Sequence, residues 1–426
     1  MSSLDKLRLL QGVLTNVPLV AFTTNPNKVH IPHTFNHTIR HLQELPITSQ
    51  YYSGRCWIFA GLNVIRHLMA AKLPNVPKNL KLSATYLYKC DKIEKCHAAL
   101  ELLFHVITTN AIPDDSPDYV LLVEGLTQDG GTWGYFVNLV EKYGIMPYDA
   151  YPENHQSAHT QSLNTILRKL ILQHGITPDT SRREFEDIKK RIMGSCQNII
   201  EMFLGSTPAK FEWRNHPMTA IEFWKYAKKV CKLQDYVVIS QYPPEAYNTK
   251  LKIQYAMNMI NKYTNFTKET QNIYLNLSPD NFTKTVMKAI RKGSPVWFAC
   301  DYGEYLLHSR SLLNTNASNL NLILDTTSPP KKDALKARVV APNHAMVILG
   351  YNTPPNDPSN PNRWKVENSH GAQGRHSGFL TMTQKYFDDM VLVAAVPKSC
   401  VGLKALATTK SKWLPFHSVL GTVANN

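Results

Sequence analysis

Cysteine is scarce in this sequence and shows no pairing pattern. The seven cysteines are spread along the chain, their number is odd, and no two of them form a Cys-x-x-Cys pair. Such usage argues against the disulfide framework of small secreted domains, and against a zinc site, because both need closely spaced ligands or partners. The sequence therefore predicts a protein of a reducing compartment that holds no metal and no other cofactor.

Long hydrophobic runs are also missing. A stretch near the beginning, residues 9–22, is interrupted by Gln11, Asn16 and Pro18, which is not typical of a signal peptide. No run approaches the length of a transmembrane helix. We therefore predict a cytoplasmic protein with no membrane partner.

Acidic residues are fewer than basic ones. The 426-residue chain has 47 Lys and Arg against 32 Asp and Glu, and its formal net charge is +15. Such a surface attracts anionic partners, but no recognised nucleic-acid-binding motif accompanies the charge. Nonspecific nucleic-acid binding is an alternative, and a generally basic surface is the favoured interpretation. The positive clusters are Lys225/Lys228/Lys229/Lys232, Lys331/Lys332/Lys336/Arg338 and Lys404/Lys410/Lys412.

Against this background, residues 50–60 contain a candidate nucleophile. Cys56 opens a run with helical apolar spacing, so its sulfur is expected at a helix N-terminus, where the helix dipole favours a thiolate. Gln50 lies shortly before it, and its side-chain amide could donate to a developing oxyanion together with the Cys56 N–H. A lone cysteine in an apolar helix is more often a buried small hydrophobe. The catalytic interpretation therefore needs a base and an orienting residue elsewhere.

Residues 343–351 and 364–371 supply these candidate partners. Each segment is predicted as a β-strand, with His344 at the start of the first and Asn368 in the turn after the second. His344 could take the thiol proton while Asn368 fixes its ring, so that Cys56 and His344 rest as a thiolate–imidazolium pair. Sixteen histidines make a chance match easy. The ordered set of Gln and Cys, then His, then Asn is specific.

These motifs resemble those of the papain superfamily and, within it, the bleomycin hydrolase family. The Ser-Gly-Arg-Cys-Trp segment at 53–57 is similar to the family's nucleophile motif, with Arg55 in place of the small residue usual in papain and cathepsins. Asn-His-Ala-Met at 343–346 and Val-Glu-Asn-Ser at 366–369 are similar to its His and Asn motifs. Further similar segments bring the resemblance to most of residues 40–400.

The resemblance implies an α+β, papain-like cysteine peptidase fold, with a helical left domain, a β-barrel-like right domain and a large helical insertion. Cys56 and His344 are separated by roughly twice the 130–150 residues typical of short papain-like enzymes, which requires such an insertion. An ordinary helical subdomain is the alternative to an oligomerisation module there. The expected parts are an N-terminal extension at 1–45, a helical half with the nucleophile at 46–160, a helical insertion for oligomerisation at 161–290, a β half with His and Asn at 291–400, and a C-terminal arm at 401–426.

The resemblance also implies a cysteine aminopeptidase, assembled as a homohexamer, that removes N-terminal residues from peptides and hydrolyses amino-acid amides or thiolactones. Asp129, Gly130 and Gly131 are expected to bind the substrate backbone, because paired glycines permit close approach. Many such pairs are simple turns. The C-terminal arm is expected to enter the cleft and place the carboxylate of Asn426 near the substrate's amino group.

Two features depart from the family pattern. The arm runs two residues, Asn425 and Asn426, beyond the alanine at which relatives end, and self-trimming is one explanation. His370 stands where the family has a tryptophan that shields the His–Asn hydrogen bond from water, and a histidine gives less apolar cover and can titrate. Two functional alternatives remain: an endopeptidase with an unblocked cleft, and a catalytically weak hexameric scaffold that binds nucleic acid.

Overall fold

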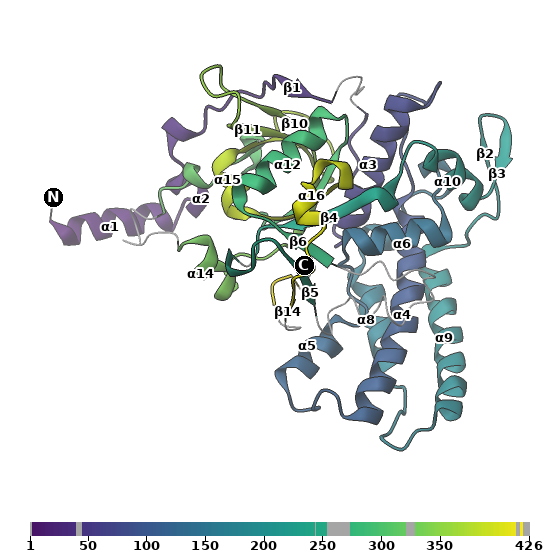
Figure 1. Cartoon of the computed structure of the whole chain (residues 1–426). Helices are drawn as coiled ribbons and strands as arrows, with labels where there is room; N and C mark the ends of the chain where they lie inside the picture. Colours follow the sequence, from purple (N-terminus) through teal and green to yellow (C-terminus); the bar gives the residue numbers. More distant parts are fainter. Residues whose placement is uncertain are drawn as a thin grey trace.

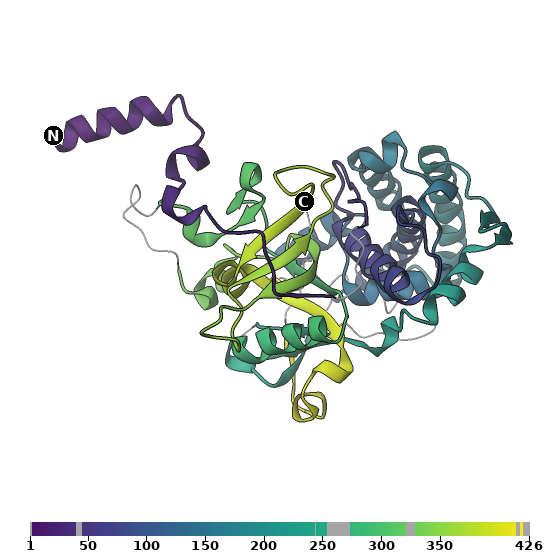
Figure 2. The same ribbon diagram turned by 90° about the horizontal axis from the view of Figure 1, so that it is seen from above.

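The computed structural model of the chain describes residues 2–39, 45–242, 244–253, 273–320, 329–414 and 418–420. Most long helices gather in one part of the molecule, and a mixed β-sheet forms the other. Figure 2 shows the two parts lying side by side. The α+β class expected from the sequence is confirmed.

The helical part is built around α3 and α4. Helix α3 begins at Cys56, as the apolar spacing predicted, and is buried along most of its length. Helix α4 starts after the N-cap Ser83, whose side chain accepts from the Tyr86 N–H, and ends at Asn110 in the left-handed conformation. The helices of this part are α3 (Cys56–Lys72), α4 (Ala84–Thr109), α5 (Pro117–Gly125), α6 (Trp133–Tyr143), α7 (His155–Ala158), α8 (Gln161–Leu172), α9 (Arg182–Leu204) and α10 (Ala220–Lys228).

One continuous sheet forms the other part. Its strands follow the order β14-β5-β6-β4-β13-β7-β10-β11-β12-β9-β8, and β1 pairs beside β10. The strands are β1 (His37–Thr38), β4 (Tyr236–Ser240), β5 (Thr249–Ile253), β6 (Ile273–Asn276), β7 (Val296–Cys300), β8 (Leu306–Leu307), β9 (Leu312–Leu313), β10 (His344–Asn352), β11 (Arg363–Glu367), β12 (Phe379–Thr383), β13 (Val391–Pro397) and β14 (Ser411–Leu414).

The central strands of this sheet are covered on two sides. Strands β7, β10 and β13 are almost wholly buried and apolar. Helix α3 packs on β10 and β7, while α12 (Pro279–Arg291) packs on β13 and β10. The nucleophile helix therefore lies directly against the strands that carry the other candidate residues. Figure 1 shows α12 and α15 (Gln384–Met390) lying over the sheet.

The segment 161–290 differs from the helical insertion expected there. It begins with α8, α9 and α10 and a small hairpin of β2 (Phe211–Trp213) and β3 (His216–Met218), but β4, β5 and β6 then enter the main sheet. Strand β4 reads Tyr-Val-Val-Ile-Ser, a β-branched run that favours extended structure. The sheet therefore uses a part of the chain well before the expected boundary at residue 291.

The first residues lie away from the body of the molecule. Helix α1 (Ser3–Leu14) starts with a capping box between Ser2 and Asp5, and Figure 2 shows this purple helix projecting outwards. Helix α2 (Leu19–Thr23) follows, and the chain then returns to the sheet through β1. The remaining short helices are α14 (Lys331–Lys336) and α16 (Leu403–Leu406).

Two further observations concern the cysteines and the hydrophobicity of the helices. All seven cysteines are buried and free. Over the described ranges, no helix is long and apolar enough to cross a membrane.

Candidate active site

The candidate nucleophile, base and orienting residue meet where α3 packs against the sheet. Cys56 is the first residue of α3 and is 1% exposed. His344 is the first residue of β10, and Asn368 directly follows β11. Because β10 and β11 are antiparallel neighbours, the start of one lies beside the end of the other. His344 Nε2 and Asn368 Oδ1 are 2.8 Å apart.

The Cys56 thiol lies at the head of β10. Burial raises the pKa of this thiol, and the backbone N–H of Ala345, the residue after His344, acts in the opposite direction. The thiol, the imidazole and the amide thus come from three segments that are far apart in the sequence. Proton transfer from a thiol to an oriented histidine needs three such groups close together, and the catalytic roles of these residues stay a prediction.

Burial of Cys56 and His344 opposes the ion pair expected from the sequence. Burial raises the pKa of Cys56 to about 11, and burial, together with the nearby His370, lowers the pKa of His344 to about 3. Both shifts favour neutral groups, because a buried site penalises charge more strongly than a helix N-terminus favours it. Burial therefore acts against the thiolate–imidazolium pair, which stays a prediction.

The hydrogen bonds of Asn368 fix the tautomer of His344. Asn368 Oδ1 also accepts the Ser369 N–H at 2.8 Å, and its Nδ2 donates to the Tyr302 hydroxyl at 3.0 Å. The amide oxygen therefore faces His344, so that Nε2 carries the ring proton. The Nδ1 lone pair is left to act as a base.

Gln50 is joined to the same network. Its Oε1 accepts from Ser369 Oγ at 2.7 Å and its backbone N–H donates to Ser369 O at 2.7 Å. One N–H of its side-chain amide is used by Ser53 O at 2.6 Å. The second N–H remains for an oxyanion, and the Cys56 N–H, at the first turn of a helix, has no intrahelical acceptor. Both donors expected for an oxyanion hole thus come from one loop.

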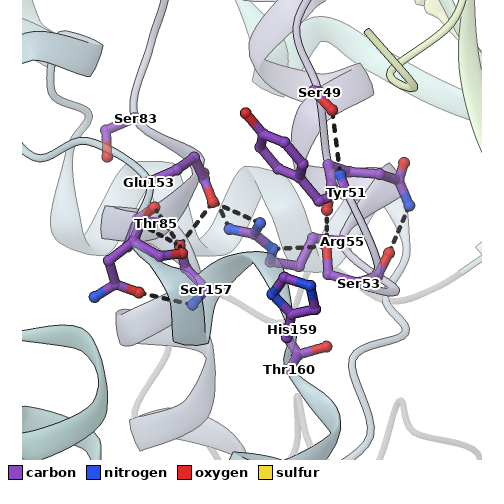
Figure 3. Close-up of polar contacts among 12 residues, drawn as sticks. Ser49, Tyr51, Ser53, Arg55, Ser83, Thr85, Glu153, Ser157, His159 and Thr160 are labelled. Carbon is purple, nitrogen blue, oxygen red and sulfur yellow. Dashed lines mark hydrogen bonds and ion pairs between the residues drawn. The ribbon is translucent and has the colours of Figure 1, made fainter.

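A buried ion pair holds this loop, and Figure 3 shows it. Arg55 forms a two-pronged contact with Glu153, at 3.1 and 2.7 Å, and its Nε donates to Ser53 Oγ at 2.9 Å. Ser53 Oγ in turn donates to Gln50 O at 2.6 Å. Glu153 also accepts from Ser157 Oγ at 2.7 Å. Arg55, which stands where papain has a small residue, therefore links the loop at residues 50–55 to Glu153 in the helical part. We call this segment the oxyanion loop.

Asp129 makes internal contacts. Its carboxylate accepts from the Gly54 N–H at 3.0 Å and from Asn164 Nδ2 at 2.7 Å, and it pairs with Lys92 Nζ at 2.9 Å. Burial alone would raise the pKa of Asp129, but Lys92 and the hydrogen bonds from Thr160 and Asn164 hold it below its usual range. These contacts support the segment just before Cys56, and a substrate-binding role stays a prediction.

The two glycines after Asp129 are also packed internally. A Cβ added to Gly131 would come within 2.4 Å of the Trp57 ring, so that no larger residue fits there. Gly130 O accepts from Lys95 Nζ at 2.8 Å. The glycine pair therefore lets this segment lie close to α3. Its pairing with a substrate stays a prediction, as does the role of Asn426, which lies outside the described residues.

A polar cavity of about 370 Å³ adjoins the oxyanion loop. Gln50, Gly54, Asp129 and His370 contribute to its wall. Within the described ranges, no group of His, Cys, Asp and Glu is placed to hold a metal ion. The cavity is open to solvent and gives small polar ligands access to the loop.

Sequence reasoning missed two residues of the site. The Tyr302 ring lies 4.4 Å from the His344 ring, centroid to centroid. Glu367, directly before Asn368, accepts hydrogen bonds from Arg66 and from His67 on α3. Tyr302 follows a segment that already resembled the family, and Glu367 lies inside the Asn motif. The positions of Tyr302 and Glu367 next to family-like segments could therefore have pointed to them. Their contacts with His344 and with α3 could not be predicted from the sequence.

The chain matches the Peptidase C1-like family over residues 2–417. It is 28% identical to bleomycin hydrolase of Mus musculus, over 92% of this chain and 89% of that protein. It is 29% identical to aminopeptidase C of Listeria innocua, with the same coverage of both proteins. The crystal structure of PepW from Lactobacillus rhamnosis superposes with a TM-score of 0.87 at 26% identity, covering 100% of this chain and 99% of that one. With its cysteine at the head of α3 and its histidine at the head of β10, the chain belongs to the Peptidase C1-like family and is a cysteine peptidase of the bleomycin hydrolase group.

Proposed function

We propose that the protein is a cysteine aminopeptidase in which Cys56, His344 and Asn368 form the catalytic triad. The observation that carries this proposal is the 2.8 Å contact between His344 Nε2 and Asn368 Oδ1 beside the buried thiol. Relatives named aminopeptidase C and bleomycin hydrolase support the same activity.

The geometry suggests a sequence of proton transfers. His344 Nδ1 takes the Cys56 proton as the sulfur attacks the substrate carbonyl, so that charge develops only when the substrate is bound. Gln50 and the Cys56 N–H stabilise the tetrahedral oxyanion. His344 then protonates the leaving amine, and water, deprotonated by His344, hydrolyses the thioester to restore the free thiol.

The proposed substrates are short peptides with a free amino terminus, and amino-acid amides or thiolactones. Selection of the amino terminus is proposed to come from the C-terminal arm and its Asn426 carboxylate, since a fixed anion favours a cationic group. We also propose a cytoplasmic setting, which the seven free, buried cysteines support, and a homohexameric assembly.

Nucleic-acid binding receives less support. Part of the positive charge in the sequence clusters is already engaged, because Lys228 pairs with Glu141 and Lys332 pairs with Glu245. Lys331 is turned inwards and donates to Asp388 O at 2.7 Å. A generally basic surface therefore remains the favoured interpretation.

Paired fluorogenic amino-acid amides test the proposal. One set has free amino termini and the other is acetylated, and both are given to wild type and to the Cys56→Ala variant. Cleavage of the free set alone, lost in the variant, is the expected result. Cleavage of both sets would identify an endopeptidase with an open cleft. Silence on both sets, with folded protein, would contradict an enzymatic role.

A further inference from the structure

The hydrogen bond between His344 and Asn368 has aromatic neighbours from two different segments. Tyr302 follows β7, and His370 follows β11. The described structure shows which side chain covers the bond in this chain.

Tyr302 covers the catalytic pair and contacts both members. Its ring lies 4.4 Å from the His344 ring at an angle of 34°, and its hydroxyl accepts from Asn368 Nδ2 at 3.0 Å. Burial raises the pKa of Tyr302 to about 12, so the phenol is neutral at neutral pH.

The backbone of Tyr302 is fixed from the same side. Its N–H donates to Asn343 Oδ1 at 2.7 Å, and Asn343 Nδ2 donates back to Tyr302 O at 3.3 Å. Because Asn343 directly precedes His344, any movement of Tyr302 is coupled to the start of β10. Asn343 thus holds the backbone of Tyr302, and Asn368 Nδ2 holds its hydroxyl.

His370 gives a smaller and more polar cover. Its ring meets His344 edge-on, with centroids 4.9 Å apart and planes at 70°. It also lines the polar cavity beside Gln50. An imidazole that borders a solvent-filled cavity excludes less water than an indole at the same position.

We propose that Tyr302 is a positioning residue that holds the Asn368 amide through its hydroxyl and shields the His344–Asn368 hydrogen bond from water with its ring. The inference rests on the proposed function, because it assigns a role within the proposed triad. The Ser369 N–H selects the oxygen of the Asn368 amide for the side that faces His344, and the Tyr302 hydroxyl, bonded to Nδ2, restricts rotation of that amide. The base therefore keeps the tautomer that can accept the thiol proton.

The groups facing His344 decide how its titration responds. They are Cys56 on α3, Cys300 and Tyr302 at and after β7, and His370 after β11. Removal of the Tyr302 ring lets water reach the His344 imidazole. The effect of burial, which lowers the pKa of His344, then becomes weaker. The pKa then rises, and because the neutral ring is the active form, the acid limb of kcat/KM moves to higher pH.

Two variants distinguish the hydrogen bond of the Tyr302 hydroxyl from the shielding by its ring. Tyr302→Phe keeps the ring and loses the hydroxyl, so kcat should fall about 3- to 10-fold with the acid limb unmoved. Tyr302→Leu loses both, so kcat should fall about 100-fold while KM changes little, and the acid limb should move to higher pH. A purely structural defect would lower the melting temperature without moving the pH profile.

Rescue from the other side is the sharpest test. In the double variant Tyr302→Leu/His370→Trp, an indole restores cover from the segment after β11, so kcat should recover about 10-fold or more. Tyr86→Leu is the matched control, since Tyr86 is buried on α4 and its hydroxyl donates to Tyr143 O at 2.7 Å, away from the triad. Its activity should equal that of wild type.

Each result decides the inference. An active wild type whose kcat and acid limb are unchanged in Tyr302→Leu would overturn it while leaving the proposed function intact. A loss in Tyr302→Leu that His370→Trp does not restore, with the acid limb unmoved, would also overturn it. A folded but inactive wild type would overturn the proposed function and the inference together.

Discussion

At the scale of single residues, Arg55 shows how a charged side chain supports a neutral loop. It is fully buried, and its guanidinium reaches Glu153 with two nitrogens and Ser53 with a third. Lysine keeps the charge, but its single nitrogen cannot reproduce the planar fork whose separate nitrogens reach Glu153 and Ser53 together. Arg55→Lys should therefore displace the Gln50 amide and lower kcat for amide hydrolysis about 10- to 100-fold. Steady-state kinetics on the free amino-acid amides measure this change.

Alkylation by iodoacetamide separates the oxyanion loop from the nucleophile, because this displacement forms no oxyanion. The alkylation rate of Cys56 in Arg55→Lys should stay at the wild-type value. Arg182→Lys serves as the control, since Arg182 makes a similar fork with Glu101, at 2.7 and 3.1 Å, between α9 and α4. Its hydrolysis rate should not change. Equal losses of alkylation and hydrolysis in Arg55→Lys would show that Arg55 acts on the thiol instead.

The sequence predicted which residues meet in the site but not what holds them. Cys56, His344 and Asn368 stand in short motifs whose local structure follows from nearby residues. The cover by Tyr302 depends on the register of β7 against β10, which pairs His344 with Cys300. The resting ion pair stays a prediction, and the burial that opposes it arises only when α3 packs on the sheet.

At the scale of elements, Glu367 ties the nucleophile helix to the strand that carries Asn368. It ends β11, is 1% exposed, and accepts hydrogen bonds from Arg66 and, at 2.5 Å, from His67 Nε2. Glu367→Gln leaves the Arg66 charge buried without its counter-ion. Removing one partner of a buried ion pair costs about 3–5 kcal/mol. Urea unfolding at neutral pH should show a loss of that size.

The same pair predicts a dependence of stability on pH. Burial alone would raise the pKa of Glu367, but Arg66 and His67 bring it below its usual value. The stabilisation is thus fully present above the unfolded pKa of about 4.3 and is lost as pH falls through the lower folded value. Between pH 7 and pH 3, wild type should lose more stability than Glu367→Gln. Equal losses would contradict this coupling.

Glu201, a glutamate in an exposed ion pair, is the control for Glu367. Glu201 on α9 pairs with Lys89, but its side chain is 47% exposed. An exposed pair contributes about 1 kcal/mol or less, so Glu201→Gln should change the free energy of unfolding little. A cost as large as that of Glu367→Gln would mean that burial is not the source of the effect.

Elements were predicted best where one pattern covers a whole segment. The apolar spacing after Cys56 predicted α3, and the motifs around His344 and Asn368 predicted β10 and β11. Strands β4 to β6 were missed within a segment read as helical. Strand β5 has five residues, Thr-Lys-Leu-Lys-Ile, and pairs with β6 in antiparallel and with β14, from the far end of the chain, in parallel. Such pairing is set by distant segments and leaves little local signal.

At the scale of the whole molecule, the site lies between two parts that must be kept together. α3 belongs to the helical part and contributes Cys56, while the sheet contributes His344 and Asn368. Contacts such as Trp297 Nε1 to Trp57 O, at 3.2 Å, cross this boundary. The catalytic geometry therefore depends on the packing of the two parts, and assembly into an oligomer would limit their relative motion.

Light scattering after size exclusion tests the proposed hexamer, for which the mass should be about six times the 48.3 kDa of one chain. Helix α1 is a candidate contact, because Leu4 and Leu7 lie on one side of it and are 54% and 61% exposed, although leucine in a monomer is usually buried. Leu4→Lys/Leu7→Lys should lower the measured mass at micromolar concentration, whereas Lys6→Glu, at an exposed position on another side of α1, should not. A monomeric wild type would contradict the hexamer, and a hexamer unaffected by the leucine changes would place the contacts on other surfaces of the chain.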